Sequence, residues 1–120
     1  MQYLTPEDMI AGGDAVFDIS IPSKLLYPAS NIDNEEDNEE VKKKMLVKLR
    51  PLTIGSFSLI MKAAKDDPSL IPLLMIKTAI VEPVFTMEQV KKLHLGLVNF
   101  LISRIREISG FDEKKNSLVS

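Results

Sequence analysis

Two stretches in which apolar and polar residues alternate predict a pair of β-strands. In residues 16–21 the apolar face is formed by Phe17, Ile19 and Ile21. In residues 45–50 it is formed by Met45, Val47 and Leu49, while Leu46 breaks the pattern. Because each stretch is short and half apolar, we expect the two strands to pair antiparallel and to place one face on a core.

Apolar residues at helical spacing follow the second strand. Thr53 can cap a first helix through its hydroxyl group, and one face of that helix carries Phe57, Ile60, Met61 and Ala64. A second helix is predicted over residues 69–81, ended by Pro83.

A third helix is predicted over residues 87–109. Thr86 and Gln89 have the spacing of a capping box, and Gly110 provides the C-terminal stop. The pattern thus predicts an α+β fold that is mostly α, with an N-terminal two-stranded antiparallel β-hairpin packed on a three-helix bundle.

The second and third predicted helices are apolar over more than half of their circumference, which exceeds what one packing neighbour covers. Burial under the N-terminal strands and binding of a partner are both open explanations, the first being slightly favoured. If a partner is bound, we expect it to contact Leu73, Met75, Ile76, Ile80, Leu95, Phe100 and Ile102.

The 120 residues are enough for one domain with a single core. Within it we expect a loose N-terminal segment (1–15), a flexible loop that is first acidic and then basic (31–44), a core module (45–110) and a frayed tail (112–120).

Composition argues against several classes of function. The net charge of −2 does not suggest binding to nucleic acid, and there is no cysteine for a disulfide or thiolate metal site. The most apolar run, residues 70–81, is too short to cross a membrane and contains Pro72 and Lys77. A cytoplasmic setting fits these features.

No catalytic constellation appears. The single histidine, His94, lies among apolar residues, and we expect it to be packed or to face a partner rather than to bind a metal or act as a base. No phosphate-binding glycine motif is present. We therefore expect no enzymatic activity, no cofactor and no metal.

Two runs of residues resemble the tail assembly chaperones of tailed bacteriophages and related phage-like particles. The first is the strand feeding a Thr-capped helix, Val47 to Phe57 (VKLRPLTIGSF). The second comprises Val81-Glu82-Pro83, Phe85-Thr86, Glu88-Gln89-Val90, Leu93, Gly96-Leu97 and Ile108-Ser109-Gly110. The resemblance covers about the last two thirds of the fold, and residues 1–40 have no counterpart in it.

The resemblance implies a non-enzymatic role in the cytoplasm of a bacterial host. Such chaperones coat the hydrophobic helical tape-measure protein and are displaced as tail-tube subunits polymerise around it. An alternative is a permanent component of a phage tail, baseplate or contractile injection particle. A third is a helical regulatory domain that dimerises through the third helix, so a homo-oligomer is possible.

Overall fold

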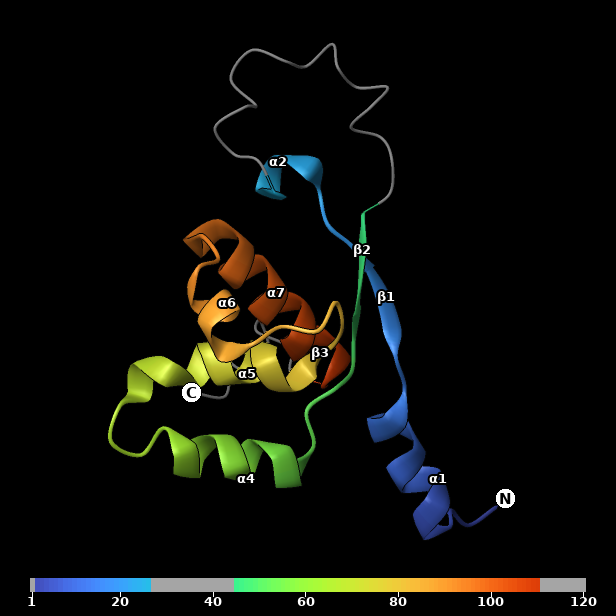
Figure 1. Cartoon of the computed structure of the whole chain (residues 1–120). Helices are drawn as coiled ribbons and strands as arrows, with labels where there is room; N and C mark the ends of the chain where they lie inside the picture. The colour runs from blue at the N-terminus through green and yellow to red at the C-terminus, as the bar shows by residue number, and fades with distance from the viewer. Residues whose placement is uncertain (1, 27–44, 111–120) are drawn as a thin grey trace, which may run out of the picture.

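A three-stranded antiparallel sheet joins the two halves of the chain (Figure 1). The computed structural model describes residues 2–26 and 45–110. Strand β1 (Phe17–Ser20) pairs with β2 (Leu46–Leu49), placing Phe17 opposite Leu49. The antiparallel pair predicted from the alternating pattern is therefore confirmed, and Leu49 is fully buried in it.

The third strand corrects the prediction of a two-stranded hairpin. Strand β3 (Ile80–Glu82) pairs with the other edge of β2, and Leu49 lies opposite Ile80. Ile80 and Val81 fall within the predicted second helix (69–81), because a short apolar run fits a helix and a strand equally well. Pairing with β2 favours the strand, because the backbone groups at the edge of β2 gain hydrogen-bond partners when the chain is extended after Ala79.

The helices begin where the capping residues predict. Helix α4 (Ile54–Ala63) follows Thr53, which forms a capping box with Ser56. Asp67 caps the short 3-10 helix η4 (Pro68–Leu70), which leads directly into α5 (Ile71–Ala79). The predicted second helix is thus shorter at both ends than residues 69–81.

The predicted third helix is divided in two. Helix α6 (Met87–Lys91) begins at the capping box of Thr86 and Gln89, and α7 (Leu95–Ile108) begins after a break at His94. Apolar residues recur at helical spacing on both sides of the break, so the sequence pattern did not reveal it. At the other end Gly110 has a φ of 95°, as expected for the residue that stops a helix.

Helix α5 lies at the centre of the helical layer, in contact with α4, α6 and α7 (Figure 1). Ile76 and Ala79 of α5 are fully buried, and so is Ile105 of α7. The four helices and the sheet together bury Ile21, Leu49, Ile60, Ala64, Met75, Ile76, Ala79, Val90, Leu97, Val98, Leu101 and Ile105. Burial of this apolar helix, the slightly favoured explanation, is therefore what the structure shows, but the cover comes from α4, α6 and α7 rather than from the N-terminal strands alone.

The N-terminal residues extend from the body. Helix α1 (Pro6–Ile10) and the 3-10 helix η1 (Ala11–Asp14) precede β1, and neither contains a buried residue. We call residues 2–16 the N-terminal arm; Figure 1 shows its helix standing apart from α4. A four-residue helix, α2 (Ser23–Leu26), follows β1. The predicted loop (31–44) and tail (112–120) lie outside the described residues.

Two leucines of α7 offer a matched test of this packing. Leu101 is 2% exposed and Leu95 is 79% exposed. Replacing Leu101 with Ala should lower the free energy of unfolding by about 2–5 kcal/mol, because it leaves a cavity in the core. Replacing Leu95 with Ala should change it by less than about 0.5 kcal/mol. Urea denaturation followed by circular dichroism measures both, and equal losses would contradict the described packing.

Candidate partner-binding site

The seven residues predicted to contact a partner lie in three different environments. Met75 and Ile76 are buried in the core, at 7% and 0% exposure. Partly buried positions packed against the core are held by Leu73, Ile80, Phe100 and Ile102. Leu95 is exposed at the start of α7. The structure therefore does not gather the seven side chains on one open face.

Phe100 illustrates why the apolar face of α7 is less available than its sequence suggests. The guanidinium carbon of Arg104 lies 5.5 Å from the centre of the Phe100 ring. Arg104 also forms an ion pair with Glu107, at 3.0 Å between Nη1 and Oε1. The ring is thus covered by a charged side chain one helical turn further on, an arrangement that favours solvent over an apolar partner.

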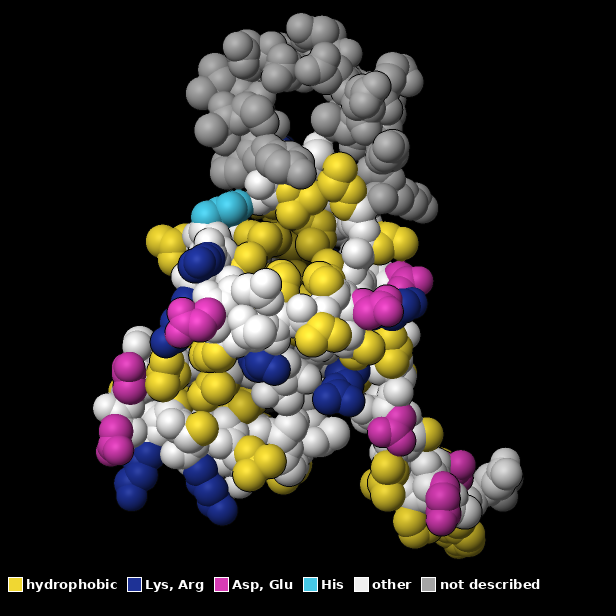
Figure 2. Space-filling model, viewed as in Figure 1, with side chains coloured by type: hydrophobic (Ala, Val, Ile, Leu, Met, Phe, Trp, Pro, Cys, Tyr) yellow, Lys and Arg dark blue, Asp and Glu magenta, His cyan; other side chains and the backbone are white. Residues whose placement is uncertain are grey.

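Exposed apolar side chains gather instead on the N-terminal arm and on α4. On the arm, Tyr3, Leu4, Met9 and Ile10 are between 63% and 90% exposed. On α4, Ile54, Phe57 and Met61 are exposed on adjoining turns, and we call these three residues the α4 stripe. Figure 2 shows apolar and acidic side chains side by side on the arm.

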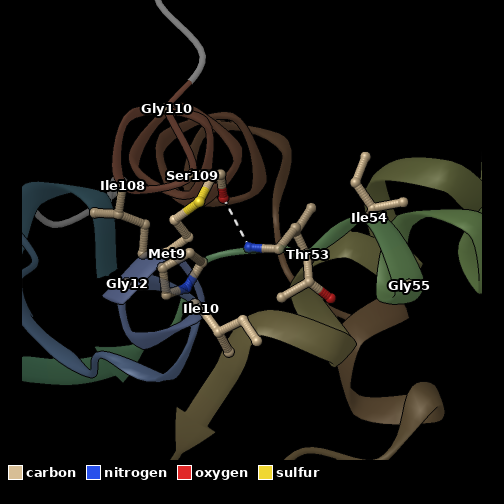
Figure 3. Close-up of a pocket in the computed structure, with 12 residues that line it drawn as sticks. Met9, Ile10, Gly12, Thr53, Ile54, Gly55, Ile108, Ser109 and Gly110 are labelled. Atoms are coloured by element: carbon tan, nitrogen blue, oxygen red, sulfur yellow. Dashed lines mark hydrogen bonds between the residues drawn. The ribbon is translucent and has the colours of Figure 1, made fainter. Parts of the chain in front are cut away.

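A groove of about 640 Å³ separates the arm from the body. Three segments distant in sequence form it: α1 with η1, the start of α4, and the end of α7 (Figure 3). Its lining includes Met9, Ile10, Leu52, Thr53, Ile54 and Ile108. The volume is within the range of ligand-binding clefts in proteins, about 300–1,000 Å³.

Two contacts fix the geometry of the groove. The backbone N–H of Leu52 donates a hydrogen bond to Oγ of Ser109, at 2.8 Å, which joins the start of α4 to the end of α7 (Figure 3). A Cβ added to Gly13 would lie 3.1 Å from Cγ2 of Thr53. The arm therefore passes close to the start of α4 at Gly13, where a larger residue would push the two apart.

The arm is also distinct in charge. Glu7 and Asp8 lie in the first turn of α1, and the helix has no basic residue in its last turn. The backbone N–H of Thr5 donates a hydrogen bond to Oδ2 of Asp8, at 2.9 Å, which lowers the pKa of the Asp8 carboxyl below its usual value. The carboxylate form of Asp8 is thus the form that closes the capping box.

His94 has a structural role. Its Nδ1 accepts a hydrogen bond from the backbone N–H of Leu97, at 3.3 Å, and so caps α7. Its Nε2 lies within hydrogen-bond distance of the carbonyl oxygen of Leu25 in α2. Because Nδ1 accepts and the carbonyl also accepts, the proton is on Nε2. Both ring nitrogens are engaged, which agrees with a packed histidine rather than a metal ligand or a base.

The side chains of residues 2–26 and 45–110 do not assemble a metal site, since no three His, Asp or Glu residues among them come together. Across the same residues, no helix combines the length and the apolar character needed to cross a membrane. What the described surface offers is an apolar groove without a cluster of chemically reactive groups.

Compared with protein-family models, curated proteins and solved structures, the chain matches none. The resemblance to phage tail assembly chaperones therefore rests on the residues quoted above.

Sequence reasoning missed the arm and Ile54. Ile54 directly follows the cap Thr53, so it occupies the first position of α4, where a side chain faces outward if the helix packs through Ile60 and Ala64. The outward direction of Ile54 could have been predicted from the helical spacing, because Ile54 does not lie on the face that carries Ile60 and Ala64. Residues 1–15 were expected to be loose, but nothing in their pattern indicated that their apolar side chains border a groove.

Removing the His94 ring should destabilise the junction between α2 and α7. We expect His94→Ala to lower the free energy of unfolding by about 1–2 kcal/mol, because a helix cap is lost. His94→Asn keeps a capping oxygen but cannot reach Leu25, so it should recover part of the loss. Chemical denaturation of the three proteins measures the difference, and an unchanged midpoint for His94→Ala would contradict the capping role.

The capping box of α1 should depend on pH. Because the pKa of Asp8 is lowered in the folded chain, its contribution is complete above the unfolded pKa, about 3.9, and is lost as the pH falls through the folded value. An NMR titration of the Asp8 carboxyl should give a midpoint below the ordinary value of 3.8. An Asp8 midpoint at or above 3.8, the ordinary value, would show that the box is open in solution.

Proposed function

We propose that this chain is a non-enzymatic phage tail assembly chaperone that binds hydrophobic helical segments of the tape-measure protein and of tail-tube subunits. The observation that carries the proposal is the apolar groove between the N-terminal arm and α4, bordered by Ile54 at 85% exposure. Grooves of this kind accept the apolar face of an amphipathic helix. The resemblance of residues 47–57 and 81–110 to this family supports the same conclusion.

The side chains around the groove suit apolar partners of varied sequence. Met9 in the groove and Met61, exposed further along α4, have flexible, polarisable side chains that adapt to different apolar partners. The acidic residues of α1 keep the arm hydrated while its apolar residues are uncovered. A chaperone needs such a surface, because it must hold many helical segments and release them when tube subunits arrive.

The partner surface proposed from the structure differs from the one expected from the sequence. Leu95 is the predicted contact that remains open, and it lies at the N-terminal end of α7. Ile108, which lines the groove, lies at the opposite end, about 20 Å away along the helix axis. Substitutions at the two ends therefore distinguish the two surfaces.

Co-purification tests the proposal directly. When the chain is expressed together with a tape-measure protein from the genome that encodes it, the two should purify together. Ile54→Asp should abolish the complex without unfolding the chain, because Ile54 is 85% exposed. Val84→Asp is the matched control, since Val84 is 82% exposed but does not line the groove.

The outcome at Leu95 completes the test. If Leu95→Asp breaks the complex and Ile54→Asp does not, the partner binds the start of α7 and the groove is not the site. If all three variants bind as well as the wild type, no apolar surface proposed here carries the interaction. Circular dichroism of each variant verifies that the helices are retained.

A permanent structural role is the second candidate, and the sheet favours it. The strand order β1-β2-β3 leaves β1 at an edge, with Val16 and Phe17 exposed. An edge strand can pair with a strand of a neighbouring subunit. Mass spectrometry of purified particles separates the candidates, because a structural component is present in fixed stoichiometry and a chaperone is absent.

A further inference from the structure

The N-terminal arm leaves its apolar side chains without a cover in its own chain. No residue of α1 or η1 is buried, and Tyr3 and Leu4 are 90% and 71% exposed. Gly13 lies close to Thr53, the N-cap residue of α4. From that point α1 runs away from the body while α4 runs in the other direction (Figure 1). The arm therefore cannot cover the far end of its own α4.

The α4 stripe is the complementary surface. Ile54, Phe57 and Met61 are separated by three and four residues, so they form one line along the helix. All three are exposed, whereas Ile60 and Ala64 on the adjacent face are buried in the core. An apolar helix of the size of α1, laid along this line, would remove both apolar surfaces from water.

The charges of the two surfaces are opposite. Residues 2–16 contain three acidic residues, Glu7, Asp8 and Asp14, and no lysine or arginine. Helix α4 contains Lys62 and no acidic residue, and Lys65 follows it; Asp66 and Asp67 come next, and Asp67 accepts hydrogen bonds from Ser69 at the start of η4. An arm placed on an α4 stripe thus brings negative charges to a positive helix, while two arms or two α4 helices would repel each other.

From this complementarity we infer that the arm binds the α4 stripe of a second copy of the chain. In a two-fold dimer each arm covers the α4 of the other copy, so the same contact occurs twice. Exchange of a terminal segment in this way needs no change in the fold of the body, because the arm contributes nothing to its own core.

This inference goes beyond the proposed function, and the two are tested separately. The dimer contact and the partner groove share Ile54, so a bound helical segment would compete with the arm of the second copy. The test of the dimer uses the chain alone, without a tape-measure protein. A monomer would overturn the arm exchange and leave the groove as a partner site.

Reversal of charge on one surface at a time tests the contact. Size-exclusion chromatography with light scattering should show that the full-length chain is a dimer. Glu7→Lys with Asp14→Lys changes the charge of residues 2–16 from −3 to +1 and so gives a positive arm facing a positive α4, and Lys62→Glu with Lys65→Glu gives a negative α4 facing a negative arm. Each variant should raise the dimer dissociation constant about tenfold or more. Glu7 and Asp14 are chosen because Asp8 closes the capping box.

Mixing the two variants gives the decisive result. In a heterodimer both contacts are again complementary, so an equimolar mixture should form dimers that neither variant forms alone. Lys91→Glu with Lys92→Glu, an exposed pair on α6 and its C-terminal cap, is the matched control and should leave the dimer intact. Leu4→Asp should also give a monomer, and it changes no buried residue.

The contradicting results are equally specific. A monomeric wild-type chain, dimeric charge-reversed variants, or a mixture that stays monomeric would each overturn the proposal. Loss of the dimer in the α6 control would show that association follows net charge rather than the arm–α4 contact. Circular dichroism on every variant separates loss of association from loss of fold.

Discussion

The burial of α5 is the constraint on which the rest of the structure depends. Its residues Ile76 and Ala79 are completely inaccessible to solvent, and the helix contacts α4, α6 and α7. A helix that is apolar on almost every side is stable in water only when it is surrounded. The three neighbouring helices and the strand that follows it, β3, are arranged to do this.

Enclosing α5 determines which apolar surface is left over. Helix α7 directs Leu97, Val98, Leu101 and Ile105 inward, so little of its apolar face remains open apart from Leu95. Helix α4 covers α5 through Ile60 and Ala64, which leaves Ile54 and its neighbours on the outside. As the sequence suggested, some apolar side chains remain exposed. They lie mainly on α4 and the arm rather than on the two helices expected to carry them.

Local signals allowed much of the fold to be predicted. The caps Thr53 and Thr86 begin α4 and α6, and the alternation in residues 45–50 gave the inward face of β2. The predictions failed where a distant contact decides the conformation. Ile80 becomes extended because β2 offers it an edge, and the helix after Lys91 is interrupted because the His94 ring reaches both Leu97 and Leu25.

The candidate site was harder to predict because it depends on three segments that meet only in the folded chain. The groove combines Met9, Ile54 and Ile108, which are separated by more than forty residues in each case. Periodicity shows which side of one helix is apolar, but it does not show which neighbour covers it. The resemblance to tail assembly chaperones pointed to a binding function without locating the surface that serves it.

Hydrogen–deuterium exchange on the complex with a tape-measure segment tests the central claim most directly. Because a bound helix would cover the groove, the account predicts slower exchange in residues 2–13, 52–57 and 108–110 than in the free chain. Exchange in residues 95–102 should not change. Protection confined to residues 95–102, or no protection in any segment of a complex that has formed, would contradict the account.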